Sequence, residues 1–125
     1  MLTDDDRKFI LNELLNNVRD ISDKEYQKRV WIRGEGPECD DFDETVCFFF
    51  DDVDAILDNY KKFGIIDSQY WLLMKFRNEF DVFSRGVGRN NPPIKFIESP
   101  EWQKIMEMAK EVLKAFNYTD RRKAL

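Results

Sequence analysis

Residues 43–63 read DETVCFFFDDVDAILDNYKKF, and this stretch decides the fold class. Its apolar side chains recur at steps of three or four residues, which is the spacing of one face of an α-helix. Lys61 and Lys62 suit the negative end of a helix dipole, and Gly64 is a suitable C-terminal stop. The stretch therefore predicts a helix from about Asp43 to Phe63. Its core face would comprise Val46, Phe49, Phe50, Val53, Ile56, Leu57 and Tyr60.

Helical signals continue on both sides of this stretch. Thr3 can cap a helix over residues 3–21, whose first turn carries three aspartates. A short polar helix over 22–31 precedes the Gly-rich stop at 34–37, and Asp67 or Ser68 can begin a helix that runs to 83. Ser99-Pro100-Glu101 is the clearest helix start, and its apolar face continues to 116. The Gly, Asn and Pro content of 84–93 predicts a surface loop.

No convincing strand pattern competes with these helices. Lys95-Phe96-Ile97 is too short, and residues 26–32 show no sustained alternation. We therefore expect an all-α, compact bundle of four to five helices, with residues 1–125 forming a single helical domain. The eleven Phe are interpreted mainly as core side chains, and Trp71 as part of the core stripe of its helix.

Composition excludes several classes of function. The net charge is -5, which is the wrong sign for binding a phosphate backbone or an anionic membrane, and the chain has no His for proton transfer or for binding a catalytic zinc. The acidic N-terminus lacks the features of a signal peptide, and no apolar run is long enough to span a membrane. We expect a cytoplasmic protein without a nucleic-acid or membrane partner, in which Cys39 and Cys47 are free thiols.

The charge of the chain is concentrated in one segment. Residues 35–58 contain ten Asp and Glu and no Lys or Arg, so this segment carries -10 and the remainder +5. Clustered like charges repel one another in a compact state, and a partner of opposite charge would offset that repulsion. The basic residues Arg85, Arg89 and Lys95, with the tail Arg121–Lys123, form a second candidate surface, although positive charge at a helix C-terminus is also an ordinary feature.

Phe48 stands out within the acidic segment. On a helical wheel it projects about 200° from Val46, on the side of Glu44, Asp51 and Asp52. An apolar side chain surrounded by charge is typical of a protein interface. The alternative is that Phe48 packs beneath another helix, because most Phe side chains are buried. The preceding loop, residues 31–44, mixes glycines, aromatics and acids, as recognition loops often do, although a helix cap would account for Asp41 or Asp43.

No catalytic motif is present. Asp41, Asp43, Thr45 and Asp52 approximate the spacing of a calcium loop, but Val46 replaces the required Gly. Gly86-Val87-Gly88-Arg89 lacks the preceding strand of a phosphate-binding loop, and the cysteines have no His partner. We therefore expect a protein that is not an enzyme and that uses no metal or cofactor. A carboxylate-based hydrolase or metal-dependent enzyme is a third hypothesis, because the acids could in principle form a catalytic pair.

In size and charge, and in the stretch Gly34-Glu35-Gly36-Pro37-Glu38-Cys39-Asp40-Asp41-Phe42-Asp43-Glu44 with the acidic helix that follows, the chain resembles the small acidic bacterial immunity proteins of toxin/immunity systems of the contact-dependent growth inhibition type. The resemblance implies stoichiometric binding and neutralisation of a cognate toxin domain, typically a basic nuclease. A helical adaptor or regulatory domain without a toxin partner is the main alternative, and the oligomeric state stays open. The residues assigned to partner binding are Glu35, Asp40, Asp41, Asp43, Glu44, Asp51 and Asp52 for charge complementarity, with Phe42 and Phe48 as apolar anchors.

Overall fold

A computed structural model describes residues 2–119 of the chain, and this part is helical without any strand. Within residues 2–119 there are six α-helices, and short π-helical and 3₁₀ segments and an irregular loop at 33–41 connect them. In chain order they are α1 (Asp4–Ser22), α2 (Lys24–Tyr26), α3 (Phe42–Asp58), α4 (Asp67–Phe83), α5 (Pro93–Phe96) and α6 (Pro100–Ala115), with a π-helical segment at Gln27–Ile32, a 3₁₀ turn at Tyr60–Phe63 and a second π-helical segment at Ser84–Gly88.

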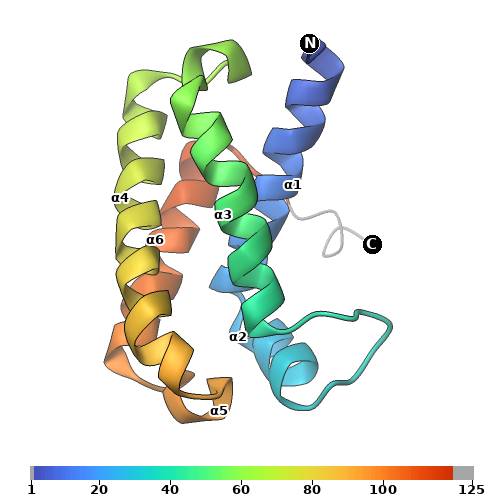
Figure 1. Ribbon diagram of the computed structural model, residues 1–125, viewed down its shortest axis with the longest axis vertical. Helices are drawn as coiled ribbons and strands as arrows, with labels where there is room; N and C mark the ends of the chain where they lie inside the picture. Colours follow the sequence, from blue (N-terminus) through green and yellow to red (C-terminus); the bar gives the residue numbers. More distant parts are fainter. Residues whose placement is uncertain (1, 120–125) are drawn as a thin grey trace.

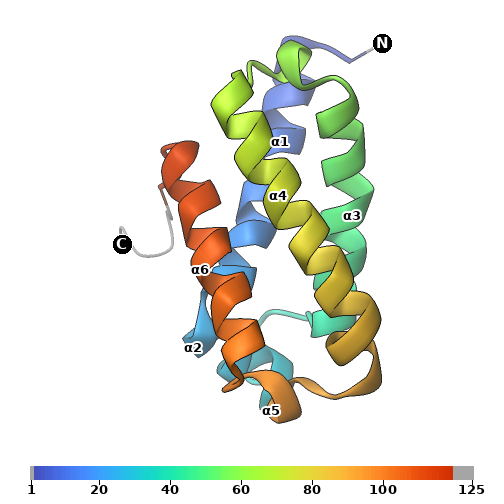
Figure 2. The ribbon, with the colours of Figure 1, turned by 90° about the vertical axis from the view of Figure 1, so that its left-hand side faces the viewer.

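The four long helices form an antiparallel bundle in which the chain runs alternately down and up (Figure 1). α1 packs against α3 and α6, and α4 packs against α3 and α6, so each long helix has two neighbours. The short helices α2 and α5 lie together at the lower end of the bundle (Figures 1 and 2). One flank of the bundle is thus formed by α1 and α3 side by side.

Local signals in the sequence explain where the long helices begin. Thr3 accepts a hydrogen bond from the Asp6 amide, and the Asp6 carboxylate accepts one from the Thr3 amide, which forms a capping box for α1. Ser99 caps α6 through the Trp102 amide and is followed by Pro100. Gly64 has φ 75°, a left-handed conformation that permits the turn from the 3₁₀ segment toward α4.

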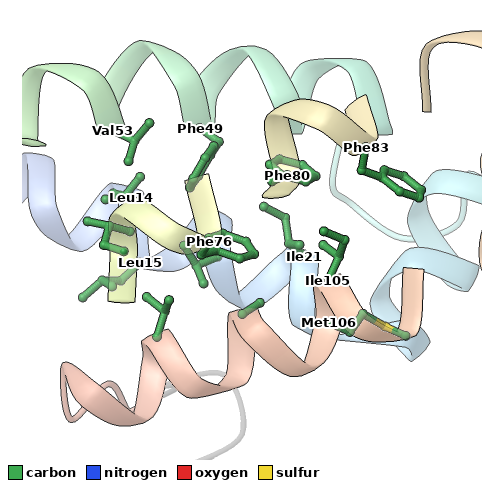
Figure 3. Close-up of a cluster of buried hydrophobic side chains, with 14 of the residues drawn as sticks. Leu14, Leu15, Ile21, Phe49, Val53, Phe76, Phe80, Phe83, Ile105 and Met106 are labelled. Atoms are coloured by element: carbon green, nitrogen blue, oxygen red, sulfur yellow. The ribbon is translucent and has the colours of Figure 1, made fainter. Parts of the chain in front are cut away.

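Aromatic side chains from α3, α4 and α6 fill the core. Phe49 of α3 lies 5.5 and 5.3 Å from Phe76 and Phe80 of α4, measured between ring centroids. Trp102 is fully buried and lies 5.1 Å from Phe83 and 5.2 Å from Phe96. Figure 3 shows Phe49 of α3 and Phe76 and Phe80 of α4 in one cluster with aliphatic side chains such as Leu14 of α1 and Ile105 of α6. The burial of these apolar side chains is the main source of stability for a small helical protein.

A buried glutamine connects three elements of the fold. Gln27, which has no exposed surface, donates from Nε2 to the backbone oxygens of Asp20 and Ile21, both at 2.9 Å. Its Oε1 accepts from Nε1 of Trp102 at 2.9 Å. The Asp20 oxygen also accepts from the Asp23 amide, whereas the Ile21 oxygen and the Trp102 indole N–H take their buried hydrogen bonds from Gln27. Gln27 therefore joins the end of α1 to the start of α6.

The structure confirms the all-α class and corrects three details. The described residues form six α-helices, where four to five were expected, because α2 and α5 are separate short helices. Residues 84–93, predicted as a loop, begin with a π-helical segment that continues directly from α4. Trp71, predicted in the core, is 67% exposed, because α4 turns this position away from α3 and α6. Within the part of the chain that the structure describes, no helix is long and apolar enough to cross a bilayer.

Candidate partner-binding surface

In the acidic segment, residues 35–58, some carboxylates bind other side chains of the protein and others face only solvent. Glu35 pairs with Nε of Arg33 at 3.1 Å, and Glu38 accepts two hydrogen bonds from Arg29, at 2.6 and 2.8 Å. Nη1 of Arg29 also donates to the backbone oxygen of Glu35. Gly36, with φ 97°, lies against this guanidinium, where a Cβ would collide with Arg29 Nη1. The loop predicted for recognition is therefore folded around Arg29.

Asp40 holds the same loop to the bundle. Its carboxylate accepts hydrogen bonds from the Tyr26 hydroxyl at 2.7 Å, from Nε1 of Trp31 at 3.2 Å and from the Thr45 hydroxyl at 3.0 Å. Burial and the hydrogen bond to Asp40 raise the pKa of Tyr26 well above its usual range. Asp41 is the N-cap of α3 and accepts from the Glu44 amide at 2.8 Å. The structure confirms Asp41 as the helix cap that the sequence offered as an alternative to partner binding, whereas the hydrogen bonds of Asp40 were not predicted.

Phe42 was predicted as an exposed anchor, and this prediction is wrong. The side chain is only 4% exposed, because the first turn of α3 directs it into the core beside Phe96 and Trp102, at 5.1 and 5.9 Å. Gly88 closes over the ring, since a Cβ at that position would lie 2.8 Å from two of its carbons. Phe42 therefore belongs to the core and is not available to a partner.

Phe48, by contrast, is 56% exposed and lies on the outer face of α3. Glu44, Asp51 and Asp58 follow the same face at intervals of seven residues, close to two helical turns. All three are exposed, as is Asp43 in the first turn. Among the described residues, none of these four carboxylates forms an ion pair, whereas Asp54, on the side of α3 that faces α4, pairs with Arg77. The outer face of α3 is thus an uncompensated acidic stripe around one exposed Phe.

Helix α1 adds a second aromatic side chain that the sequence reasoning missed. Phe9 is 65% exposed and lines a groove of about 310 Å³ between α1 and α3. We call this feature the α1–α3 groove. It is lined by Phe9, Ile10, Glu13 and Asn17 of α1 and by Phe48 and Asp52 of α3. A signal for Phe9 was present in the sequence, because Phe9, Glu13 and Asn17 recur every four residues on a polar flank of the helix.

The groove is electrostatically negative. Asp52, expected on the fully exposed side of α3, is half-buried against α1. Burial, together with the charges of Asp51 and Glu13, raises the pKa of its carboxyl above the usual value. Neither Asp52 nor Glu13 forms an ion pair with any residue in the described range 2–119. Two exposed phenylalanines therefore share one groove with two carboxylates that have no ion-pair partner within residues 2–119.

Other surface features are less concentrated. Val82 and Val87 are exposed beside a groove between α4 and α6, where Glu79 and Lys104 pair at 3.6 Å. Arg85 pairs with Asp81 in the preceding turn, and the basic tail Arg121–Lys123 lies outside the described residues. Cys39 and Cys47 are both free and exposed. No cluster of three His, Cys, Asp or Glu suited to a metal ion occurs among residues 2–119.

Comparison with known proteins places most of the chain in one family. A family model described as "Domain of unknown function (DUF7945)" matches residues 10–124. That range includes α3 and all of α1 except its first two turns, and thus most of the α1–α3 groove. No curated protein and no solved structure matches the chain.

Proposed function

The chain belongs to the DUF7945 family, whose description assigns no activity, and from its own surface we propose that it binds and neutralises a basic protein partner through the outer faces of α1 and α3. The partner we propose is a toxin domain, and the mode is stoichiometric inhibition without catalysis. Residues of the α1–α3 groove and of the acidic stripe on α3 would form the contact.

One observation carries this proposal: Phe9 and Phe48 are exposed together in a groove whose carboxylates, Glu13 and Asp52, form no ion pair among the described residues. An isolated exposed apolar side chain is ordinary on a protein surface, but two large rings in one groove are a feature of binding sites. Aromatic anchors encircled by polar groups provide the desolvated contacts that dominate the binding energy of many protein interfaces. The groove thus supports protein binding more strongly than the loop at 31–44 does.

The charge of the surface supports a basic partner. Glu44, Asp51 and Asp58 lack internal counterions among the described residues, so they attract positive charge at long range. A domain that cleaves nucleic acid carries a cationic cleft that binds phosphates. The positive potential of that cleft also attracts a carboxylate-rich protein surface. Electrostatic attraction of this kind accelerates association and weakens as salt is added. The toxin identity itself rests on the resemblance to bacterial immunity proteins.

The proposal is tested by affinity capture from native cells at low salt, with three forms of the protein. The wild type is compared with Phe48→Ala/Asp51→Lys, which changes the proposed surface. The control is Val82→Ala/Glu79→Lys, which combines an apolar truncation and a charge reversal on the far side of the bundle and also removes the Glu79–Lys104 ion pair. Circular dichroism verifies that all three are folded.

We expect one dominant basic protein with the wild type and the control, and its loss with Phe48→Ala/Asp51→Lys. Inhibition of the captured protein's toxic or nuclease activity at one-to-one stoichiometry would support the toxin form of the proposal. A captured partner without toxic activity would favour the alternative of an adaptor domain. Retention of the partner by Phe48→Ala/Asp51→Lys would rule out the proposed surface.

A further inference from the structure

The chain contains an internal arginine site that shows what α3 can bind. Arg77 of α4 places its guanidinium carbon 5.3 Å from the centroid of the Phe50 ring. Its Nε and Nη2 donate to the two carboxylate oxygens of Asp54, at 3.0 and 3.4 Å. Phe50 and Asp54 are four residues apart on α3, so their side chains are neighbours along the helix. Phe50 and Asp54 thus contact one guanidinium through a cation–π interaction and charge-assisted hydrogen bonds, while Asp81 and Asn78 of α4 contact its Nη1.

The same pair of residue types occurs again on the outer side of α3. Phe48 and Asp52 are also four residues apart, and they are displaced from Phe50 and Asp54 by two residues, which is a rotation of about 200° around the helix. Both line the α1–α3 groove. In the described part of the chain no Lys or Arg pairs with Asp52. The outer pair therefore repeats the inner pair without its cation.

Helix α1 completes the environment of the outer pair. Glu13 contributes a second carboxylate to the groove, and Ile10 and Phe9 contribute apolar surface. Among the described residues the rings of Phe9 and Phe48 make no ring contact with each other, and both line the groove. Burial first, and then the neighbouring charges of Asp51 and Glu13, raise the pKa of the Asp52 carboxyl in this groove. A long side chain with an apolar stem and a planar cationic end matches these features.

We propose that the α1–α3 groove binds an arginine side chain of the partner protein, with the guanidinium over the Phe48 ring and between the carboxylates of Asp52 and Glu13. The inference rests on the proposed function and specifies the chemistry of the partner. Arginine is favoured over lysine because its planar guanidinium stacks on an aromatic ring and donates two parallel hydrogen bonds, whereas an ammonium group is a compact, strongly hydrated charge. The methylene stem of the arginine would lie along Ile10 and Phe9.

The test is a titration of the folded full-length protein with two capped peptides, hexa-arginine and hexa-lysine, at low salt. Affinity is measured by calorimetry, and the binding site is mapped from the backbone amide shifts in NMR spectra. We expect the arginine peptide to bind about two- to fivefold more tightly, which is the size of one exposed cation–π contact. The largest amide shifts should fall within residues 9–17 and 44–55.

Two substitutions separate the arginine site from general attraction to acids. Phe48→Leu keeps an apolar side chain but removes the aromatic face, so it should abolish the preference for arginine and weaken the arginine peptide more than the lysine peptide. Asp52→Asn should weaken the arginine peptide more than Asp58→Asn does, because Asp58 lies on the same helix and has the same charge but does not line the groove. Each variant is checked for an unchanged fold by its NMR spectrum.

Equal affinity for the two peptides, a preference that survives Phe48→Leu, or no binding of either peptide would overturn the arginine site. These results would leave the proposed function standing if affinity capture still shows loss of a basic partner with Phe48→Ala/Asp51→Lys. Conversely, an arginine preference that depends on Phe48 would support the site even where capture fails to yield a toxin.

Discussion

Phe48 and Phe49 are consecutive residues with opposite environments, and their truncation should have very different effects. Phe49 is fully buried and contacts Phe50, Phe76 and Phe80 at centroid distances of 5.0–5.5 Å. Phe49→Ala would leave a cavity among these rings, and such substitutions cost about 3–5 kcal/mol. The free energy of unfolding should fall by that amount, which is a large fraction of the stability of a small domain.

Phe48 has less than half of its surface covered. Full burial of a Phe side chain contributes about 1.5–3 kcal/mol, so the covered part of Phe48 contributes about 1 kcal/mol. Ala also has a higher helix propensity, which returns up to about 0.5 kcal/mol. We therefore expect Phe48→Ala to lower the free energy of unfolding by less than about 1 kcal/mol, while it removes partner binding.

Urea denaturation followed by circular dichroism measures the free energy of unfolding of both variants. The two variants can be compared directly, because both replace Phe by Ala in the same helix. Similar losses for Phe48→Ala and Phe49→Ala would refute the reasoning, because Phe48 would then be a core residue and no longer an exposed anchor. The same result would remove the main support for the α1–α3 groove as a binding surface.

Three other perturbations test the environments of individual residues. Gln27→Leu should lower the free energy of unfolding by about 2–4 kcal/mol, because it leaves the Trp102 indole N–H and a carbonyl of α1 buried without partners. The exposed control Gln103→Leu should change it by less than about 0.5 kcal/mol. Equal effects of the two substitutions in urea denaturation would contradict this. Asp40→Asn should lower the pKa of Tyr26, measured by NMR titration, because it removes the carboxylate that accepts from the Tyr26 hydroxyl; an unchanged pKa would contradict the contact. The pKa of Asp52 is higher in the folded state than its usual value of 3.8, so the ionised carboxylate opposes folding. The free energy of unfolding should therefore increase as the pH falls through the folded-state pKa and Asp52 takes up a proton. Asp52→Asn should remove this increase and stabilise the protein at neutral pH by less than about 1 kcal/mol, and a destabilised variant in urea denaturation at neutral pH would show the opposite sign.

Much of the helical framework could be predicted because its signals are local. Thr3 and Ser99 cap the helices that their positions predict, and Gly64 adopts the left-handed turn expected of it. The short helices were harder to predict from the sequence. α5 has only four residues, which is too short for a periodic pattern to emerge, and the π-helical segment after Phe83 depends on packing against α5 and α4.

The candidate surface could be predicted only in part. Counting charges identified the acidic segment, and the helical wheel predicted the side of α3 on which Phe48 lies. The wheel gave no information about contacts between distant residues, such as Arg29 with Glu38 or Tyr26 with Asp40, and these contacts assign the loop acids to the fold. Phe9 was missed because its role depends on the packing of α1 against α3.

Phe42 and Trp71 were both placed incorrectly from the sequence: Phe42 was predicted to be exposed and is buried, and Trp71 was predicted to be buried and is exposed. Phe42 is the first residue of α3, and only the approach of Gly88 and Phe96 explains why it is buried. Trp71 belongs to a broad apolar stripe on α4, and the arrangement of the neighbouring helices leaves this residue outside. Side-chain periodicity predicts that a helix has an apolar face, whereas the edges of that face depend on tertiary packing.

Hydrogen–deuterium exchange of the protein, alone and in complex with its captured partner, tests binding through α1 and α3 most directly. The measurement reports protection along the whole chain without any substitution that could disturb the fold. We predict added protection in residues 9–17 and 44–55, with little change in the loop at 33–41 or along α4. Added protection confined to that loop, or to the groove beside Val82 and Val87, would contradict the account and place the partner on another face of the bundle.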